Sequence, residues 1–311
     1  MIRILSTVLC LMPAVALAQD ATRLSGPVTG IIFDAKSHAL RPMVGVPGAS
    51  YLGDALVSGL DAAAVSPDGS RALAVADGRL SLITGLREGA AQSAVLDGAI
   101  PAVDRIAWSP DGAFAGVYCS SAGSAQLIRE AAGNPAPGAA ADVPFPVNAL
   151  AVGMNGELIA GADGGVYLLS PGAAPRLLAP MTSVVALAVR GTSLYAADTG
   201  AGQVWLIENY AGGASASIFL DSIDAPVGIA ISADGRRLLA ASRKAKTVAV
   251  LDTASHAPLR SLNLDIAPAE LTGFGGRDVW LLNNSSGADP IYIATGGDEP
   301  AAWFVPAGRG Q

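Results

Sequence analysis

Few residues in this chain have the types and spacing that enzyme chemistry needs. The only histidines, His38 and His256, stand far apart, and two isolated imidazoles do not make a multi-histidine metal site. The patterns HExxH, CxxC and GxSxG do not occur. Glycine-rich pieces such as residues 161–165 (GADGG) lead into a strand pattern rather than a helix, so they do not resemble a phosphate loop. We therefore expect no metal and no cofactor, and we interpret both histidines as ordinary loop or surface residues.

The first residues have the features of a secretory signal peptide. Arg3 precedes an apolar run over residues 4–15, and Ala16-Leu17-Ala18 forms a small-x-small cleavage site. We predict cleavage after Ala18, a mature chain of residues 19–311, and a periplasmic or secreted location. Cleavage would remove Cys10 and leave Cys119 as a single cysteine, without an intramolecular disulfide. Cys119 ends the strand-like segment FAGVYC, which predicts a small buried hydrophobic residue rather than a reactive thiol.

The composition excludes two broad classes of protein. Hydrophobic residues make up 51% of the chain and charged residues 14%, against roughly 25% charged in ordinary soluble domains. Beyond the signal, however, the apolar residues occur in short runs broken by Gly, Pro and charges, so no membrane-spanning helix is expected. The net charge of −7 argues against nucleic-acid binding, which needs a basic face.

A recurring turn organises the elements that would position any functional side chain. Each turn follows a short apolar segment, and successive turns are about 40 residues apart. The turns are Phe33-Asp34-Ala35-Lys36, Ser66-Pro67-Asp68-Gly69, Ser109-Pro110-Asp111-Gly112, Gly153-Met154-Asn155-Gly156, Arg190-Gly191-Thr192, Ser232-Ala233-Asp234-Gly235 and Gly273-Phe274-Gly275-Gly276.

This period predicts an all-β fold, a single β-propeller of seven four-stranded blades. Residues 225–252 show the unit most clearly, because three apolar segments of about five residues are separated by polar turns. Four antiparallel strands repeated at this spacing are typical of propeller blades around a central channel. We also expect the last apolar segment, residues 301–305 (AAWFV), to complete a blade, with the two chain ends side by side.

Two of the units resemble known propeller repeats. Residues 226–228 (PVG), 233–238 (ADGRRL) and 247–252 (TVAVLD) of the sixth unit resemble the YVTN repeat. Residues 194–200 (LYAADTG) of the fifth unit are similar to the related NHL repeat. The resemblance implies an exported bacterial propeller with a binding role. It implies no activity, because these families share no single one.

Candidate binding residues lie in the turns that vary from unit to unit. In a propeller, the turns between second and third strands share one face with the links between blades, and loops on a rigid scaffold are where binding residues sit. We call this the variable face. The candidates on it are Asp77, Asp163, Asp198, Arg243, Lys244, Lys246 and Asn283. The three basic residues in one turn suggest contact with an acidic partner or an anionic ligand, although solvated hairpin tips explain the same pattern.

Two functional hypotheses remain from the sequence. The first is a non-catalytic scaffold, acting as a monomer, that binds a protein partner or a small ligand in the cell envelope. The second is a propeller enzyme or electron-transfer subunit, similar to a metal-dependent lactonase or a quinone dehydrogenase, with a site built from scattered carboxylates. We prefer the first, because no acid–base pair or metal cluster is visible in the sequence.

Overall fold

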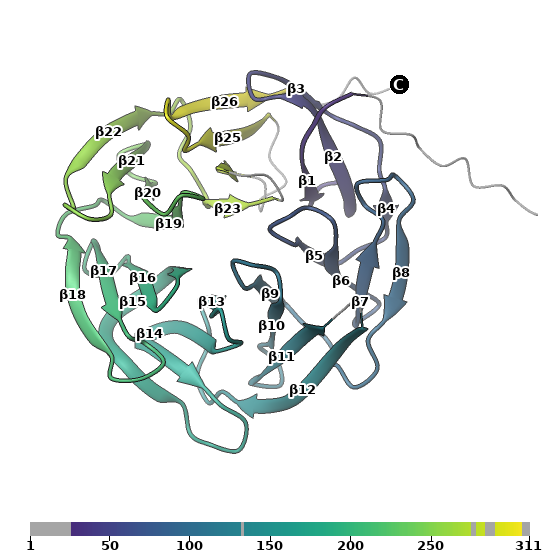
Figure 1. Ribbon diagram of the computed structural model, residues 1–311, viewed down its shortest axis with the longest axis horizontal. Coiled ribbons are helices and arrows are strands. Elements are labelled where there is room, and N and C mark those ends of the chain that lie inside the picture. The colour runs from purple at the N-terminus through teal and green to yellow at the C-terminus, as the bar shows by residue number, and fades with distance from the viewer. Residues whose placement is uncertain (1–25, 132–133, 275–277, 284–289, 307–311) are drawn as a thin grey trace, which may run out of the picture.

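The computed structural model describes residues 26–131, 134–274, 278–283 and 290–306. They form a ring of antiparallel sheets around a central opening (Figure 1), which confirms an all-β propeller. The predicted signal peptide lies outside the described residues. Within them, no helix has the length and apolar character needed to cross a membrane.

Five of the six sheets have four strands each, and every sheet is built from consecutive strands. The first sheet contains β1 (Val28–Asp34), β2 (Ala39–Val46), β3 (Ala49–Leu52) and β4 (Val57–Ser58). The second contains β5 (Ala62–Val65), β6 (Ala72–Ala76), β7 (Arg79–Thr84) and β8 (Gln92–Val95). The third contains β9 (Arg105–Trp108), β10 (Phe114–Cys119), β11 (Ser124–Ala131) and β12 (Asn134–Asp142).

The other half of the ring contains the remaining three sheets. The largest has six strands, β13 (Ala149–Val152), β14 (Leu158–Leu169), β15 (Arg176–Arg190), β16 (Ser193–Asp198), β17 (Gln203–Glu208) and β18 (Ser215–Leu220). The next contains β19 (Pro226–Ile231), β20 (Arg237–Ser242), β21 (Thr247–Asp252) and β22 (Pro258–Asn263). The last contains β23 (Thr272–Gly273), β24 (Val279–Leu281), β25 (Ile291–Thr295) and β26 (Ala301–Val305).

The prediction of seven four-stranded blades is wrong, because strand pairing gives six blades. The residues assigned to a fourth and a fifth blade form the single six-stranded sheet. Strand β15 joins them: its first part pairs with β14 and its second part pairs with β16. Where a link between blades was expected, the chain stays in one strand, whose pairing with β14 ends at Ser183 and whose pairing with β16 begins at Val184.

Local chemistry explains why β15 is not interrupted. Thr182 and the following Val184 and Val185 are β-branched residues that favour extended backbone. The carboxylate of Asp198 accepts the N–H groups of Thr182 and Ser183, at 2.7 and 2.9 Å, which holds this junction in place. No glycine or proline lies between Met181 and Arg190 to break the strand.

The repeated turns, in contrast, lie where the sequence predicts them. In the three Ser-x-Asp-Gly turns, the serine hydroxyl donates to the aspartate two residues later and accepts the N–H five residues later. The turn glycines Gly69, Gly112 and Gly235 have φ near +70°, a conformation that favours glycine. These Asp-Gly turns are therefore structural, as expected. Gly275 and Gly276 of the last turn lie outside the described residues.

Most inner strands are buried on both faces, because each blade packs between two others. In β20, Leu238 and Ala240 join the core cluster on the side of Tyr195, whereas Leu239 and Ala241 join the cluster on the side of Trp280. This two-sided burial explains the excess of Ala, Val and Leu in the composition.

The ring closes between the first sheet and the last, a junction that we call the seam. The N–H of Ile31 donates to the carbonyl of Phe274 at 3.0 Å, and Ile32 of β1 shares a core cluster with Ile293 and Val305 of the last sheet. Strand β26 is the outer strand of the last sheet, so the prediction that residues 301–305 complete a blade is confirmed. Within the described residues the two sheets share no strand, and the seam is held by this backbone hydrogen bond and by apolar side-chain packing.

Candidate functional site

The structure places the predicted site residues around the variable face and does not gather them into one site. Asp163 and Asp198 are the exception, because Ser183 joins them: its hydroxyl donates to Asp163 at 2.7 Å and its N–H to Asp198 at 2.9 Å. Asn148 also donates to Asp163, at 3.0 Å. Among the described residues, no group of three or more His, Cys, Asp or Glu residues is arranged to hold a metal ion.

Asp198 is a structural carboxylate. It is 1% exposed and accepts N–H groups from Thr182, Ser183, Gly200 and Ala201. Four backbone donors occupy its acceptor sites, so little capacity remains for a ligand. The same carboxylate that sequence analysis marked as a binding candidate therefore fixes the junction inside β15.

Asp77 and Asn283 also have evident structural roles. Asp77 and Gly78 both have positive φ, of 50° and 71°, as in the two-residue hairpin turn that suits Asp-Gly. Asn283 is 7% exposed, donates to the carbonyl of Pro290 and accepts the N–H of Tyr292. The loop residues 284–289 beside it lie outside the described residues.

The basic turn between β20 and β21 is exposed at Arg243, Lys244 and Lys246. Lys244 lies 3.6 Å from Asp224, and both side chains are solvent-exposed, so this ion pair contributes little to stability. The basic turn stands among carboxylates, since the other charged residues in the turns and links of this face are Asp61, Asp77, Asp97, Asp104, Asp221, Asp224, Asp265 and Glu270.

The histidines and the cysteine match their expected roles. His38 and His256 both have positive φ and lie in turns. The Nδ1 atom of His38 is hydrogen-bonded to the carbonyl of Leu60, and the ring of His256 packs on Phe219 with centroids 4.4 Å apart. Cys119 is 1% exposed at the end of β10.

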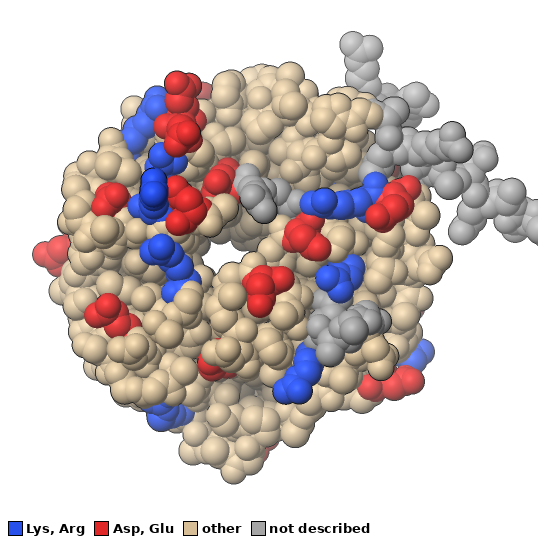
Figure 2. Space-filling model, viewed as in Figure 1, with Lys and Arg blue, Asp and Glu red and all other residues tan. Residues whose placement is uncertain are grey.

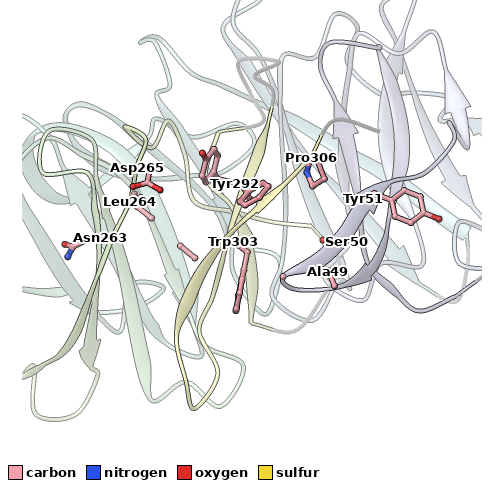
Figure 3. Close-up of a pocket in the computed structure, with 12 residues that line it drawn as sticks. Ala49, Ser50, Tyr51, Asn263, Leu264, Asp265, Tyr292, Trp303 and Pro306 are labelled. Atoms are coloured by element: carbon pink, nitrogen blue, oxygen red, sulfur yellow. The ribbon is translucent and has the colours of Figure 1, made fainter. Parts of the chain in front are cut away.

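A groove at the seam, which sequence analysis did not identify, is the strongest candidate site. We call it the seam groove; its lining residues are 48–51, 263–265, 292, 302–304 and 306. Its volume of about 490 Å³ is in the usual range for ligand sites. Figure 3 shows Tyr292 and Trp303 in the middle, Asp265 on the side of β22 and Ser50 on the side of β3. Three elements distant in sequence therefore meet here.

Strand β26 divides the groove into two sides. Its side chains alternate, so Ala302 and Phe304 face β22, where Ala302 packs against the cluster that contains Leu262 and Leu264. Trp303 and Val305 face the first sheet. The ring of Trp303 lies against the β2–β3 turn, where a Cβ atom on Gly48 would be 3.0 Å from it.

The aromatic residues of the groove are unusually open to solvent. The side chains of Trp303 and Phe304 are 41% and 62% exposed, and that of Tyr51 is 50% exposed. On the side of the first sheet, the β2–β3 turn packs against the ring of Trp303 and still leaves that residue 41% exposed. Figure 2 shows the area over β3 and the adjoining part of β26, at the top of the view, without charged side chains, whereas charges of both signs lie at the end of β26 nearer β22 and surround the central opening.

Two polar features complete the groove. The Oγ atom of Ser50 is buried and has no hydrogen-bond partner among the described residues. Such groups are rare, and a bound molecule is one explanation for them. Asp265 is the charged residue in the lining, with Asn263 beside it. The groove thus presents apolar side chains with a few hydrogen-bonding groups. This arrangement suits ligand binding rather than catalysis.

The sequence did contain one signal for this groove. Trp303 and Phe304 are consecutive residues in a five-residue strand, and consecutive side chains point to opposite faces. Two large aromatic residues on opposite faces of an outermost strand have no second sheet to cover both. An exposed apolar surface follows once that strand is known to be at an edge.

Comparisons with known proteins establish the fold alone. No family model matches the chain, and no curated protein matches it. Among solved structures, it is similar to a functionally unknown protein from Desulfotomaculum acetoxidans DSM 771, with a TM-score of 0.60 and 12% identity over 89% of this chain and 99% of that one. It is also similar to the β-propeller domain of Cps50 (Swd1) from Myceliophteria thermophila, with a TM-score of 0.59 and 12% identity over 90% of this chain and 88% of that domain.

Proposed function

We propose that this propeller is a non-catalytic binding scaffold of the cell envelope, and that a protein partner binds in the seam groove. The observation that carries the proposal is the exposure of Trp303 and Phe304 on the two faces of β26, in a groove that also contains the unpaired Ser50 hydroxyl on its first-sheet side. Contiguous exposed apolar surface rimmed by polar residues is typical of interaction sites. Aromatic residues are also enriched among those that carry most of the binding energy in interfaces.

The rest of the outer surface supports this choice of site. The exposed large apolar residues on β8, β15, β18 and β22 are single side chains, namely Val95, Leu177, Ile218 and Leu259. At the seam, by contrast, three exposed aromatic residues, Tyr51, Trp303 and Phe304, line one groove. Isolated apolar residues on a surface are ordinary, whereas a cluster of aromatic residues calls for a partner.

The proposal includes export to the periplasm or the exterior, as the signal-like residues 1–18 suggest. The resemblance of two units to YVTN and NHL repeats supports the same assignment, because such propellers commonly bind partners. Mass spectrometry of the protein recovered from its native host tests export, since a mature chain that begins at Gln19 is expected. A full-length chain retained in the cytoplasm would contradict this part of the proposal.

Site-specific photo-crosslinking tests the binding site itself. A photoreactive phenylalanine analogue at Phe304 is expected to capture an envelope protein, whereas the same analogue at Leu259 of β22 should not. Leu259 is a matched control, because it is 53% exposed and does not line the groove, although its strand β22 ends at the lining residue Asn263. Adding Trp303→Ala to the Phe304 probe should abolish the product. Equal capture from both positions, or capture that survives Trp303→Ala, would refute the seam groove as the site.

A further inference from the structure

The seam groove is centred on a strand with an open hydrogen-bonding edge. Strand β26 pairs with β25 and with no other strand among the described residues. In an edge strand, alternate residues turn their N–H and C=O groups away from the sheet, where another strand can pair with them.

This edge lacks the usual protection against pairing. Strand β12 carries Pro135 and Pro137, and β22 carries Pro258 and Arg260, which are residues that discourage pairing at an edge. The sequence of β26, AAWFV, has neither a proline nor a charge. Strands β8 and β18 also lack such residues, but each exposes a single large apolar side chain. Strand β26 therefore combines an unprotected edge with exposed aromatic side chains on both of its faces.

The lining favours a particular kind of occupant. A strand added to β26 would direct successive side chains alternately toward Trp303 and toward Phe304, so its residues on both faces would contact apolar surface. Asp265 lies at the β22 side of the groove, and the lining contains no basic residue. Charge complementarity thus favours one Lys or Arg at that end of the occupant. On the other side, the Ser50 hydroxyl is buried and has no partner among the described residues.

We infer that the occupant is an extended segment of a partner protein that pairs with β26 as a fifth strand of the last sheet. The segment is apolar and carries a Lys or Arg that contacts Asp265. This inference rests on the proposed function, because it specifies what binds in the seam groove.

A random twelve-residue peptide library displayed on phage is the first test. Selection on the wild-type protein, with counter-selection on Trp303→Ala/Phe304→Ala, is expected to enrich extended apolar sequences with one basic residue. An enriched peptide should bind the wild-type protein at least about tenfold more tightly than the double variant, as the loss of two aromatic contacts implies. If no sequence is enriched, the inference is wrong.

Backbone methylation of the enriched peptide tests strand pairing without altering the protein. N-methylation at alternate residues in one register should weaken binding at least about tenfold, because it removes the N–H groups that pair with β26. Methylation in the other register should have much less effect. Equal binding by both methylated peptides would show that the groove binds peptides without strand addition, which overturns the inference and leaves the proposed function standing.

The proposed contact between Asp265 and a basic residue of the peptide is tested with one variant and one matched control variant. Asp265→Asn should weaken binding of the enriched peptide by about threefold at low salt and less at high salt, because the charge pair at the groove is screened. The control Asp97→Asn, in a link of the second sheet, should not change the affinity. An Asp265→Asn variant that binds as tightly as the wild type would refute the basic residue in the occupant.

Two further outcomes separate this inference from the proposed function. If the crosslink from Phe304 joins two copies of this chain in solution, the groove is a self-association surface, and the inference fails. If the crosslink captures an envelope protein but no segment of that protein binds as a peptide, the partner binds by folded surface contacts. In that case the proposed function survives and the strand-pairing inference does not.

Discussion

At the residue scale, several aspartates of the propeller act as hydrogen-bond acceptors for backbone N–H groups. Asp68, Asp111 and Asp234 each accept a serine hydroxyl and an N–H two residues later, and Asp198 accepts four N–H groups. Sequence analysis assigned the turn aspartates correctly, because Asp-Gly carries a recognisable backbone requirement. It assigned Asp198 to a binding surface, because nothing in the sequence reveals that Thr182 and Ser183 lie beside it.

The turn carboxylates make the free energy of unfolding depend on pH in the acidic range. Burial alone would raise the pKa of Asp68, but hydrogen bonds from Ser66 and Ser70 and the charge of Arg71 outweigh it and lower the pKa from 3.8 to about 2. A carboxyl group with a lowered folded-state pKa stabilises the fold above its unfolded pKa and loses that contribution as pH falls through the folded value. Stability should therefore fall between about pH 4 and pH 2.

Asp68→Asn should reduce this acid dependence. At pH 7 the variant should be less stable by under about 1 kcal/mol, because the carboxylate is exposed and its interactions are screened by solvent. The difference from wild type should shrink as pH approaches 2. Urea unfolding measured from pH 7 to pH 2 checks this expectation. A difference that does not vary with pH would contradict it.

Asp198→Ala should have a much larger effect. The substitution leaves four N–H donors without their acceptor at a site where the side chain is 1% exposed, and we expect a loss of about 2–4 kcal/mol in the free energy of unfolding. Asp77→Asn, at an exposed hairpin tip, is the control and should stay within about 0.5 kcal/mol of wild type. Similar urea midpoints for the two variants would show that Asp198 does not hold the β15 junction.

At the element scale, β15 and β26 are the strands whose behaviour the sequence did not reveal. The repeated turn marks only the step from a first to a second strand, so it located the turns but not the links between blades. Strand β15 continues past Pro180 and through the expected link, where no glycine or proline follows Met181, and one six-stranded sheet results. The apolar character of β26 was visible in AAWFV. Its position at an edge, which makes Trp303 and Phe304 a candidate site, depends on the neighbouring sheets.

Strand β26 also contributes to closing the ring. Val305 is 1% exposed within the cluster that spans the seam, and β26 covers the edge of β25. Truncation after Gly297 removes β26 and exposes this apolar surface, which costs on the order of 25 cal/mol per Å². We expect the melting temperature to fall by about 5 °C or more.

Truncation after Pro306 is the matched control, because it retains β26 while still shortening the chain. Its melting temperature should remain that of the full chain. Calorimetric scans of both truncated proteins settle the comparison. A shortened chain that ends at Gly297 and melts like the full chain would show that β26 is dispensable for ring closure.

At the scale of the whole molecule, charge is distributed differently from the apolar surface. In Figure 2 the outer part of the seam, over β3 and the adjoining part of β26, shows no charged side chain, while the variable face carries carboxylates in its turns and links and one basic turn. The composition predicted an acidic protein, and the turn at Arg243, Lys244 and Lys246 was visible as a local exception. The separation of the charged and apolar areas follows only from the folded ring.

The basic turn provides the last prediction. We propose that it steers an acidic surface of the partner, since its positive charges stand out from an acidic face. Replacing Arg243, Lys244 and Lys246 with Glu should change the free energy of unfolding by at most about 0.5 kcal/mol per substitution. Capture of the envelope partner should weaken at low salt and change little at high salt, where charges are screened. If the triple variant folds normally and still captures the partner as well as the wild type at low salt, the basic turn has no role in binding and is only a solvated hairpin tip.

The order of the strands within each sheet determines where the chain can be circularly permuted. Since every sheet consists of consecutive strands and the two described ends meet at the seam, joining residue 306 to residue 26 by a short linker requires no rethreading. New ends placed in the links at residues 96–104 or 143–148 would leave all ladders whole. The chain between Ser183 and Val184 is different, because an opening there interrupts strand β15 itself, at the point where its pairing with β14 ends and its pairing with β16 begins. Circular permutation thus has positions between sheets that leave every strand whole, and one position inside β15 that does not.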